Sequence, residues 1–268
     1  KYKKFKFLKE SIENLTILKL KIKKVDIVIN LAAQAGVRYS FTNPEKYFDS
    51  NITGFINFTN QILKLKPKTY IYASSSSVYG DQNNYPIKEK APLLSKNLYG
   101  LTKIFNEDYI NRIYKNKKMM FVGLRFFTVY GPWGRPDMVM YKILESIYRG
   151  KKLNLYNHGK HIRDFTFVED IVNIVFTLSK KKAIYKHFIF NICSSKPVHL
   201  LKILKIFSLK TKKKIKIKKI GFQKGDIYKT YGDNKKIKKF INFNKFTKID
   251  FGIDKMIEWY RKYNKINL

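Results

Sequence analysis

The chain has 268 residues, of which 44% are hydrophobic and 28% are charged. This composition excludes a disordered chain and is enough for one large domain or two small ones. The formal net charge is +37, but the lysines are spread along the whole chain, so we expect no nucleic acid as partner. The single cysteine excludes an internal disulfide and favours the cytoplasm, and no apolar run approaches the roughly 20 residues of a membrane span.

The N-terminal part of the chain predicts two strands and a short helix. Residues 1–9 alternate lysine with phenylalanine and leucine, which indicates a strand, and residues 11–20 suit a short helix. Residues 25–33 have the pattern of a buried parallel strand that ends in small side chains. Small side chains at a strand end let a cofactor approach the backbone, and a simple tight turn is the alternative explanation.

The next two segments predict a helix and a serine-ended strand. Apolar residues at helical spacing favour a helix over residues 44–66. Asn51 lies inside it, where an asparagine is usually exposed or bonded to local backbone. Residues 70–80 read Tyr-Ile-Tyr-Ala-Ser-Ser-Ser-Ser-Val-Tyr-Gly. This run predicts a buried parallel strand that delivers four hydroxyls at its carboxyl end.

A helical pattern with a tyrosine and a lysine on one face follows the serine strand. Ser95 or Asn97 can cap this helix, and Tyr99 and Lys103 lie four residues apart. A neighbouring ammonium favours the phenolate over the phenol, so the tyrosine can accept a proton while a strand-end serine holds the substrate hydroxyl. The same spacing recurs by chance in this lysine-rich chain, and only the pair at Tyr99 follows a serine-ended strand.

The second half of the chain continues to alternate strands with helices. We expect strands over residues 119–127 and 187–192, helices over 138–149 and 253–260, and a strand followed by a helix over 164–178. This alternation predicts a doubly wound parallel sheet of the Rossmann-like α/β class, whose ligands lie beyond the carboxyl ends of the strands. The four histidines lack a metal-ligand pattern, so we expect no metal.

Four motifs stand out together: Asn30–Ala33, Ser74–Gly80, Tyr99-x-x-x-Lys103 and Leu124–Pro132. They resemble the extended short-chain dehydrogenase/reductase family, in particular its NAD-dependent epimerase/dehydratase members that act on nucleotide sugars. The similarity is greatest to UDP-glucuronate 4-epimerases, through three longer segments: Ala32–Ser40, Gly131–Met138 and Arg163–Phe167. The resemblance covers nearly the whole chain in register.

The resemblance implies an NAD-dependent 4-epimerase that converts UDP-glucuronate to UDP-galacturonate through a 4-keto intermediate. Tyr99 would take the proton of the C4 hydroxyl, Lys103 would tune Tyr99 and hold the nicotinamide ribose, and Ser75 would bond to the C4 oxygen. The residues that match the cofactor site of the family are Leu31, Ala32, Ala33, Asn51, Tyr99, Lys103 and Phe126.

The resemblance also implies a substrate site, made of Ser76, Ser77, Thr128, Arg135, Arg163 and Asp226. Arg163 would bind the UDP phosphates and Arg135 would face the sugar, because guanidinium groups suit phosphate and carboxylate. Related dehydratases and UDP-glucuronate decarboxylases carry carboxylates where Ser76 or Ser77 stands, so the hydroxyls favour an epimerase. For Arg38, a substrate role and a place on the solvated surface are equally open.

The start of the chain departs from the family pattern. It has no Gly-x-x-Gly-x-x-Gly turn and no acidic residue for the adenosine ribose. Ser11 stands where relatives usually place an aspartate, for which Glu10 or Glu13 would substitute. We therefore expect an N-terminal truncation of about one βαβ unit, at least ~30 residues, and poor binding of NAD by this chain.

Several alternatives remain open. One alternative is UDP-glucose 4-epimerase or another epimerase or dehydratase, and a second is an inactive remnant that binds only sugar nucleotide. A third is a nucleic-acid-binding protein whose basic patch is Lys210–Lys219, although this run also suits a charged edge strand. The resemblance implies a homodimer through helices near Phe48–Lys64 and Lys96–Tyr114. The expected division places a truncated NAD-binding domain in residues 1–128 and 164–195, and a UDP-sugar-binding region in residues 129–163 and 196–268.

Overall fold

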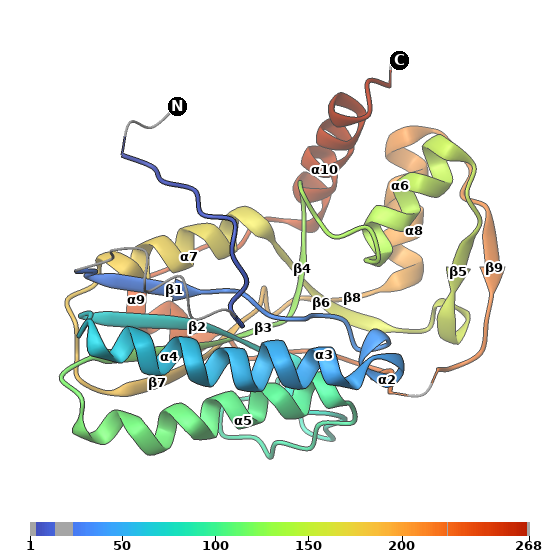
Figure 1. The fold of residues 1–268 in the computed structure, drawn as a ribbon. Coiled ribbons are helices and arrows are strands. Elements are labelled where there is room, and N and C mark those ends of the chain that lie inside the picture. The colour runs from blue at the N-terminus through green and yellow to red at the C-terminus, as the bar shows by residue number, and fades with distance from the viewer. Residues whose placement is uncertain (1–3, 14–23, 224, 267–268) are drawn as a thin grey trace. The chain divides into compact units, whose positions relative to one another are not determined.

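The chain divides into two compact units, and the computed structural model describes residues 4–13, 24–223 and 225–266 of it (Figure 1). The first unit consists of Lys1–Val78, Asn97–Leu124 and Lys182–Ile189, and the second of Tyr79–Lys96, Arg125–Lys181 and Phe190–Leu268. These boundaries follow the packing of the backbone. The division expected from the sequence instead separates the residues for NAD from those for the UDP-sugar, and it stays a prediction.

A four-stranded sheet in the order β1-β2-β3-β7 lies at the centre of the first unit. Its strands are β1 (Ile27–Asn30), β2 (Thr69–Ser75), β3 (Met120–Phe126) and β7 (His187–Ile192), of which β3 and β7 end in the second unit. β1 and β2 pair in parallel, with Ile27 opposite Thr69. The predicted Rossmann-like α/β class is confirmed.

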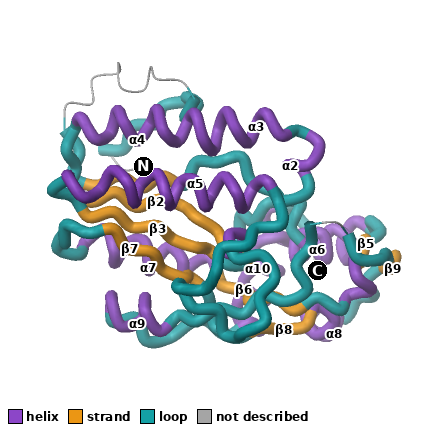
Figure 2. The backbone as a smooth tube through the Cα atoms, turned by 90° about the horizontal axis from the view of Figure 1, so that it is seen from below, coloured by secondary structure: helices purple, strands orange, loops and turns teal. Residues whose placement is uncertain are grey.

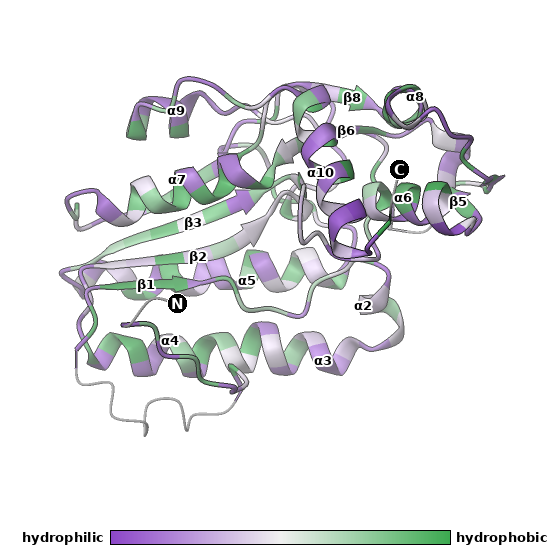
Figure 3. Ribbon diagram, turned by 90° about the horizontal axis from the view of Figure 1, so that it is seen from above, coloured by the Kyte–Doolittle hydropathy of each residue, from purple (hydrophilic) through white to green (hydrophobic). Residues whose placement is uncertain are grey.

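The burial of β2 explains why its sequence is a continuous run and not an alternating one. Every residue of β2 except Ala73 is buried, because the strand has other structure on both faces. β1, at the edge of the sheet, instead buries Val28 and Asn30 and exposes Ile27 and Ile29. Both β1 and β3 are drawn mainly in the colours of hydrophobic residues in Figure 3. The serines at the end of β2 therefore project from a rigid core strand.

The helices of the first unit form one layer beside this sheet. They are α2 (Tyr39–Thr42), α3 (Pro44–Phe48), the π-helical turn η1 (Asp49–Gly54), α4 (Phe55–Lys64), α5 (Leu98–Ile113) and the 3₁₀ turns η2 (Ser76–Val78) and η3 (Tyr114–Asn116). α4 and α5 run side by side (Figure 2), and the hydroxyl of Tyr109 donates to Asn60 at 2.6 Å. The helix predicted over residues 44–66 is confirmed, with a π-helical turn in its middle.

The second unit is built from two small sheets and the helices around them. Its strands are β4 (Thr128–Tyr130), β5 (Leu153–Leu155), β6 (Ile162–Phe167), β8 (Pro197–His199) and β9 (Ile217–Lys219). Its helices are α6 (Val139–Arg149), η4 (Tyr156–Gly159), α7 (Val168–Lys180), α8 (Leu200–Thr211), α9 (Lys235–Ile241) and α10 (Ile249–Tyr263). Ile143, Phe207 and Ile253 are fully buried in the core that joins α6, α8 and α10.

Two expectations from the sequence need correction. Residues 5–10 have no regular secondary structure, so the strand expected over residues 1–9 is wrong in the part that the structure describes. Alternation of side chains makes a strand only where a neighbouring strand pairs with its backbone, and here Phe5 and Phe7 are left exposed. The helix expected over residues 11–20 lies mostly outside the described residues. In the basic run Lys210–Lys219, only the last three residues form a strand, β9, which pairs with β5.

Candidate functional site

The carboxyl end of β2 places a row of hydroxyls where the strand turns into η2. Ser74 and Ser75 are buried, whereas Ser76 and Ser77 are half-buried. The hydroxyl oxygen of Ser75 accepts a hydrogen bond from the backbone N–H of Ser77 at 3.1 Å. This bond fixes the position of the oxygen and leaves the proton of Ser75 available for a further acceptor.

The first two turns of α5 bring Tyr99 and Lys103 to this strand. Asn97 caps the helix by accepting from the N–H of Gly100 at 2.9 Å, so of the two cap residues expected, Asn97 holds that position. The ammonium of Lys103 donates to the carbonyl oxygen of Ala73, two residues before Ser75, at 3.0 Å. The same nitrogen lies 5.8 Å from the ring centroid of Tyr99. The serine strand and the Tyr/Lys helix are therefore neighbours within the first unit.

A buried carboxylate, which the sequence analysis missed, acts on Lys103. Burial lowers the pKa of Lys103 to about 8, and the charge of Glu107 opposes this shift by raising the pKa. Glu107 is itself buried and accepts a hydrogen bond from the hydroxyl of Ser74 at 2.5 Å. The signal in the sequence was the spacing, because Glu107 follows Lys103 by one helical turn.

Asn51 ties the loop after β1 to the helix that carries Tyr99. It lies in η1 and is buried. Its side-chain oxygen accepts from the N–H of Gln34 at 2.8 Å, and its nitrogen donates to the carbonyl of Gln34 at 3.0 Å and to the hydroxyl of Thr102 at 3.1 Å. Thr102 in turn donates to the carbonyl of Tyr99 at 2.8 Å. These bonds give Asn51 a supporting position, and its contact with the cofactor stays a prediction.

The end of β1 and the head of Lys103 fit the nicotinamide half of a dinucleotide. Leu31 is 54% exposed although it is a large apolar residue at a strand end, and Ala32 is exposed beside it. In the described part of the chain, Lys103 has the carbonyl of Ala73 as its hydrogen-bond acceptor, although an ammonium has three donors. An exposed apolar strand end suits a nicotinamide ring, and an ammonium with spare donors suits the hydroxyls of its ribose.

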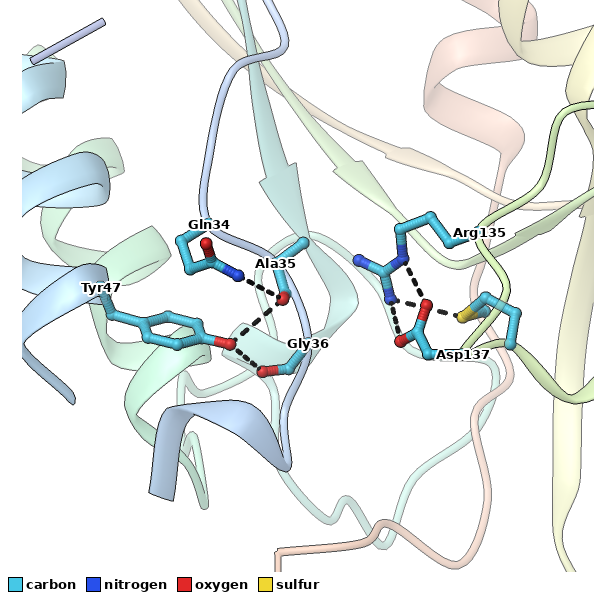
Figure 4. Close-up of polar contacts among 7 residues, drawn as sticks. Gln34, Ala35, Gly36, Tyr47, Arg135 and Asp137 are labelled. Atoms are coloured by element: carbon cyan, nitrogen blue, oxygen red, sulfur yellow. Dashed lines mark hydrogen bonds and ion pairs between the residues drawn. The ribbon is translucent and has the colours of Figure 1, made fainter. Parts of the chain in front are cut away.

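Two predicted substrate residues line one pocket in the second unit. Thr128, at the start of β4, and Arg135, in the loop before α6, both face this pocket together with Gly131 and Gly134. The guanidinium of Arg135 donates to both carboxylate oxygens of Asp137, at 3.0 Å each (Figure 4). Both side chains are largely exposed, so water screens this ion pair and other anions can compete for the guanidinium.

Arg163 and Asp226, the other two charged residues of the predicted substrate site, lie in one cluster of the second unit around His161. Arg163 donates to the carbonyls of Ile162 and Tyr228 at 2.9 and 3.0 Å. Its second terminal nitrogen is 3.3 Å from Nδ1 of His161, whose Nε2 is 3.6 Å from the carboxylate of Asp226. The sequence offered no role for His161, and the structure places it between these two charged residues. Phe126, at the end of β3, is half-buried, and its contact with the cofactor stays a prediction.

Asp164 is a buried acid that holds three segments of the second unit together. Its carboxylate accepts from the hydroxyl of Ser194 at 2.8 Å and from the N–H of Gly232 at 3.1 Å, and its own N–H donates to Thr230. Burial raises the pKa of Asp164 to about 6, against which the hydrogen bonds from Ser194 and Gly232 act. An acid with a raised pKa stabilises the fold at low pH and loses that contribution as the pH rises through the folded-state value.

We therefore expect Asp164→Asn to gain stability relative to the natural chain as the pH rises from 4 to 7. The gain is on the order of 3 kcal/mol, because the asparagine never carries the buried charge. Urea unfolding of both proteins across this pH range measures the difference. A difference in unfolding free energy that stays constant with pH would show that Asp164 does not titrate in the folded state.

Two further properties of the described residues bear on the class of site. No group of three or more histidine, cysteine, aspartate or glutamate side chains in the described ranges is arranged to hold a metal ion. Among the same residues, no helix is both long and apolar enough to cross a bilayer.

Comparison with known proteins gives consistent results. Residues 6–193 match the family described as NAD dependent epimerase/dehydratase. Protein CapI of Staphylococcus aureus is 37% identical, over 94% of this chain and 84% of that protein. UDP-glucuronate 4-epimerase 4 of Arabidopsis thaliana is 34% identical, over 88% of this chain and 58% of that protein. The crystal structure of UDP-glucuronic acid 4-epimerase from Bacillus cereus, in complex with UDP-glucuronic acid and NAD, superposes with a TM-score of 0.91 at 26% identity, covering 98% of this chain and 83% of that one.

Proposed function

We propose, since the chain belongs to the NAD dependent epimerase/dehydratase family, that it inverts C4 of UDP-glucuronate to give UDP-galacturonate. The observation that carries this proposal is the arrangement in the first unit. Lys103 of α5 bonds to β2 two residues before Ser75, and its ammonium lies close to the ring of Tyr99. The named relatives and the solved UDP-glucuronic acid 4-epimerase support the choice of substrate.

In the proposed mechanism the residues of this chain manage one proton. Ser75 donates to the C4 oxygen and orients it, and Tyr99, as phenolate, takes the proton of the C4 hydroxyl. NAD, when bound, would supply the chemistry that accepts the hydride of C4 and gives it back on the opposite face after the 4-keto sugar has turned over in the site. Tyr99 then gives the proton back to the C4 oxygen, so the reaction is redox-neutral overall. Lys103 keeps the phenolate favourable as long as it is protonated.

The half-buried hydroxyls of Ser76 and Ser77 support a uronic acid as the sugar. A 4-keto glucuronate is a β-keto acid, which loses CO2 easily. Two hydroxyls can donate to the sugar carboxylate and hold it. A serine at each of these positions also leaves the site without a carboxylate side chain there that would move protons at C5 or C6. The proposed clamp therefore favours epimerisation over decarboxylation and dehydration.

Polar and charged residues of the second unit supply the proposed sites for the nucleotide and for the sugar carboxylate. We assign Arg163 to the phosphates, Asp226 to the ribose and Thr128 to the region near the diphosphate. Arg135 is assigned to the sugar, because its exposed pair with Asp137 is weak enough for a substrate carboxylate to replace. The expected homodimer remains part of the proposal, supported by the exposed apolar residues Phe48, Leu101 and Phe105 on the helices of the first unit.

The test is a direct assay of the 268-residue chain with UDP-glucuronate and with NAD raised until the rate no longer increases, because poor binding of NAD is expected. We expect UDP-galacturonate to accumulate until a mixture of the two sugars is reached, without release of CO2. UDP-glucose in a parallel reaction should convert far more slowly. Conversion of UDP-glucose in preference to UDP-glucuronate, CO2 release with formation of a pentose, or no conversion of either sugar would each overturn the proposal.

A further inference from the structure

Tyr47 connects the loop after β1 to the aromatic ring of Tyr99. It lies in α3 and is fully buried. Its hydroxyl contacts the carbonyl oxygens of Gly36 and of Ala35, the latter at 3.1 Å, as Figure 4 shows. Its ring meets that of Tyr99 edge to face, with the centroids 6.3 Å apart and the planes at 76°. One side chain therefore contacts both the loop and the proposed base.

The direction of the phenol oxygen of Tyr99 depends on what packs against its ring. Tyr99 is the second residue of α5 and is half-buried. Rotation about its Cα–Cβ bond moves the oxygen along an arc unless neighbouring groups restrict the ring. Lys103 contributes a small cation near this ring. Tyr47 contributes a whole aromatic ring in the geometry that aromatic pairs prefer.

Tyr47 can restrict Tyr99 only if it is itself held in place. Its hydroxyl is hydrogen-bonded to the carbonyls of Ala35 and Gly36. The preceding residue, Gln34, is hydrogen-bonded to Asn51 through both its backbone N–H and its carbonyl. Gly36 has φ 109°, so the loop conformation that presents its carbonyl depends on glycine. Three consecutive residues of the loop are thus tied to the segment made of α3 and η1.

We infer that Tyr47 is a positioning residue for the reaction: its hydroxyl fixes its own ring to the Ala35–Gly36 backbone, and this ring holds Tyr99 in the orientation in which it takes the proton. The inference rests on the proposed function, because that function makes Tyr99 the base. It assigns Tyr47 no contact with the substrate. The effect of Tyr47 therefore passes through Tyr99 and appears in the rate of the chemical step.

Two substitutions separate the hydroxyl from the ring. Tyr47→Phe keeps the ring and loses the bonds to the loop, and Tyr47→Leu loses both. We expect kcat for UDP-glucuronate to fall about fivefold in the first and about fiftyfold in the second, because small misplacements of a reacting group are costly. KM should stay within about twofold, since the substrate contacts are unchanged. The deuterium isotope effect on kcat, measured with substrate deuterated at C4, should rise as chemistry becomes slower.

The matched control is Tyr72→Phe, which removes another fully buried tyrosine hydroxyl of the first unit, 2.8 Å from His187. It should lower stability and leave kcat per folded molecule and the isotope effect unchanged. If Tyr47→Phe behaves in the same way, Tyr47 is merely structural and the inference is wrong. If the natural chain does not convert UDP-glucuronate at all, the proposed function fails instead.

Amide hydrogen exchange tests the positioning itself without any assay of activity. Tyr47→Phe should speed exchange in residues 34–36 and 97–103, and Tyr72→Phe should not. Unchanged exchange in Tyr47→Phe would overturn the inference even if the enzyme is active.

Discussion

Replacing Tyr99 with phenylalanine should lower kcat for UDP-glucuronate by on the order of a thousandfold, because the reaction then has no group that takes the proton of the C4 hydroxyl. The substitution removes one oxygen and keeps the ring, so the edge-to-face contact with Tyr47 survives. KM should change little, since the proposed contacts to the nucleotide come from other residues. Steady-state kinetics with added NAD measure both quantities.

The control for this substitution is Tyr109→Phe. Tyr109 lies on the same helix, and its hydroxyl bonds to Asn60 of α4, a residue to which the proposed mechanism gives no role. We expect its kcat to stay within about twofold of the natural chain, because an exposed hydrogen bond contributes little. A Tyr99→Phe enzyme that retains more than about a tenth of the natural rate would show that another group is the base.

The elements that the sequence predicted well are those whose signal is local. The run Tyr70–Ala73 is continuously apolar because β2 is buried on both faces, so the burial of the strand can be read from its composition. The start of α5 was visible in the same way, since Asn97 is a cap residue followed by a helical pattern. The matching motifs then connected these two local signals to one known family.

The parts that could not be predicted depend on contacts distant in sequence. Ser74 bonds to Glu107, and Tyr47 packs on Tyr99, across gaps of 33 and 52 residues. The π-helical turn at Asp49–Gly54 places Asn51 toward Gln34. The spacing of apolar residues in the sequence indicates a helix here but does not show that one of its turns is π-helical. The strand expected over residues 1–9 failed for the opposite reason, because its alternation was local and no neighbouring strand pairs with the described part of it.

Replacing Lys103 with methionine should reduce kcat by on the order of a hundredfold, because the phenolate of Tyr99 then loses the cation that favours it. The exposed Lys118 offers a matched control. It has the same spacing from a tyrosine, Tyr114, but lies outside the site. Lys118→Met should leave kcat unchanged. Equal losses in the two variants would mean that the charge of Lys103 has no special role.

The same lysine predicts the pH dependence of the reaction. Its pKa is lowered to about 8, so the ammonium is present below that value and is lost as the pH rises through it. We expect kcat/KM to fall on the alkaline side with an apparent pKa near 8. Glu107 raises the pKa of Lys103, so Glu107→Gln removes that support and should move the alkaline limb to lower pH. An unmoved limb in Glu107→Gln would assign the titration to a different group. A limb moved to higher pH would contradict the role of Glu107, because loss of a negative charge cannot help a buried ammonium keep its proton.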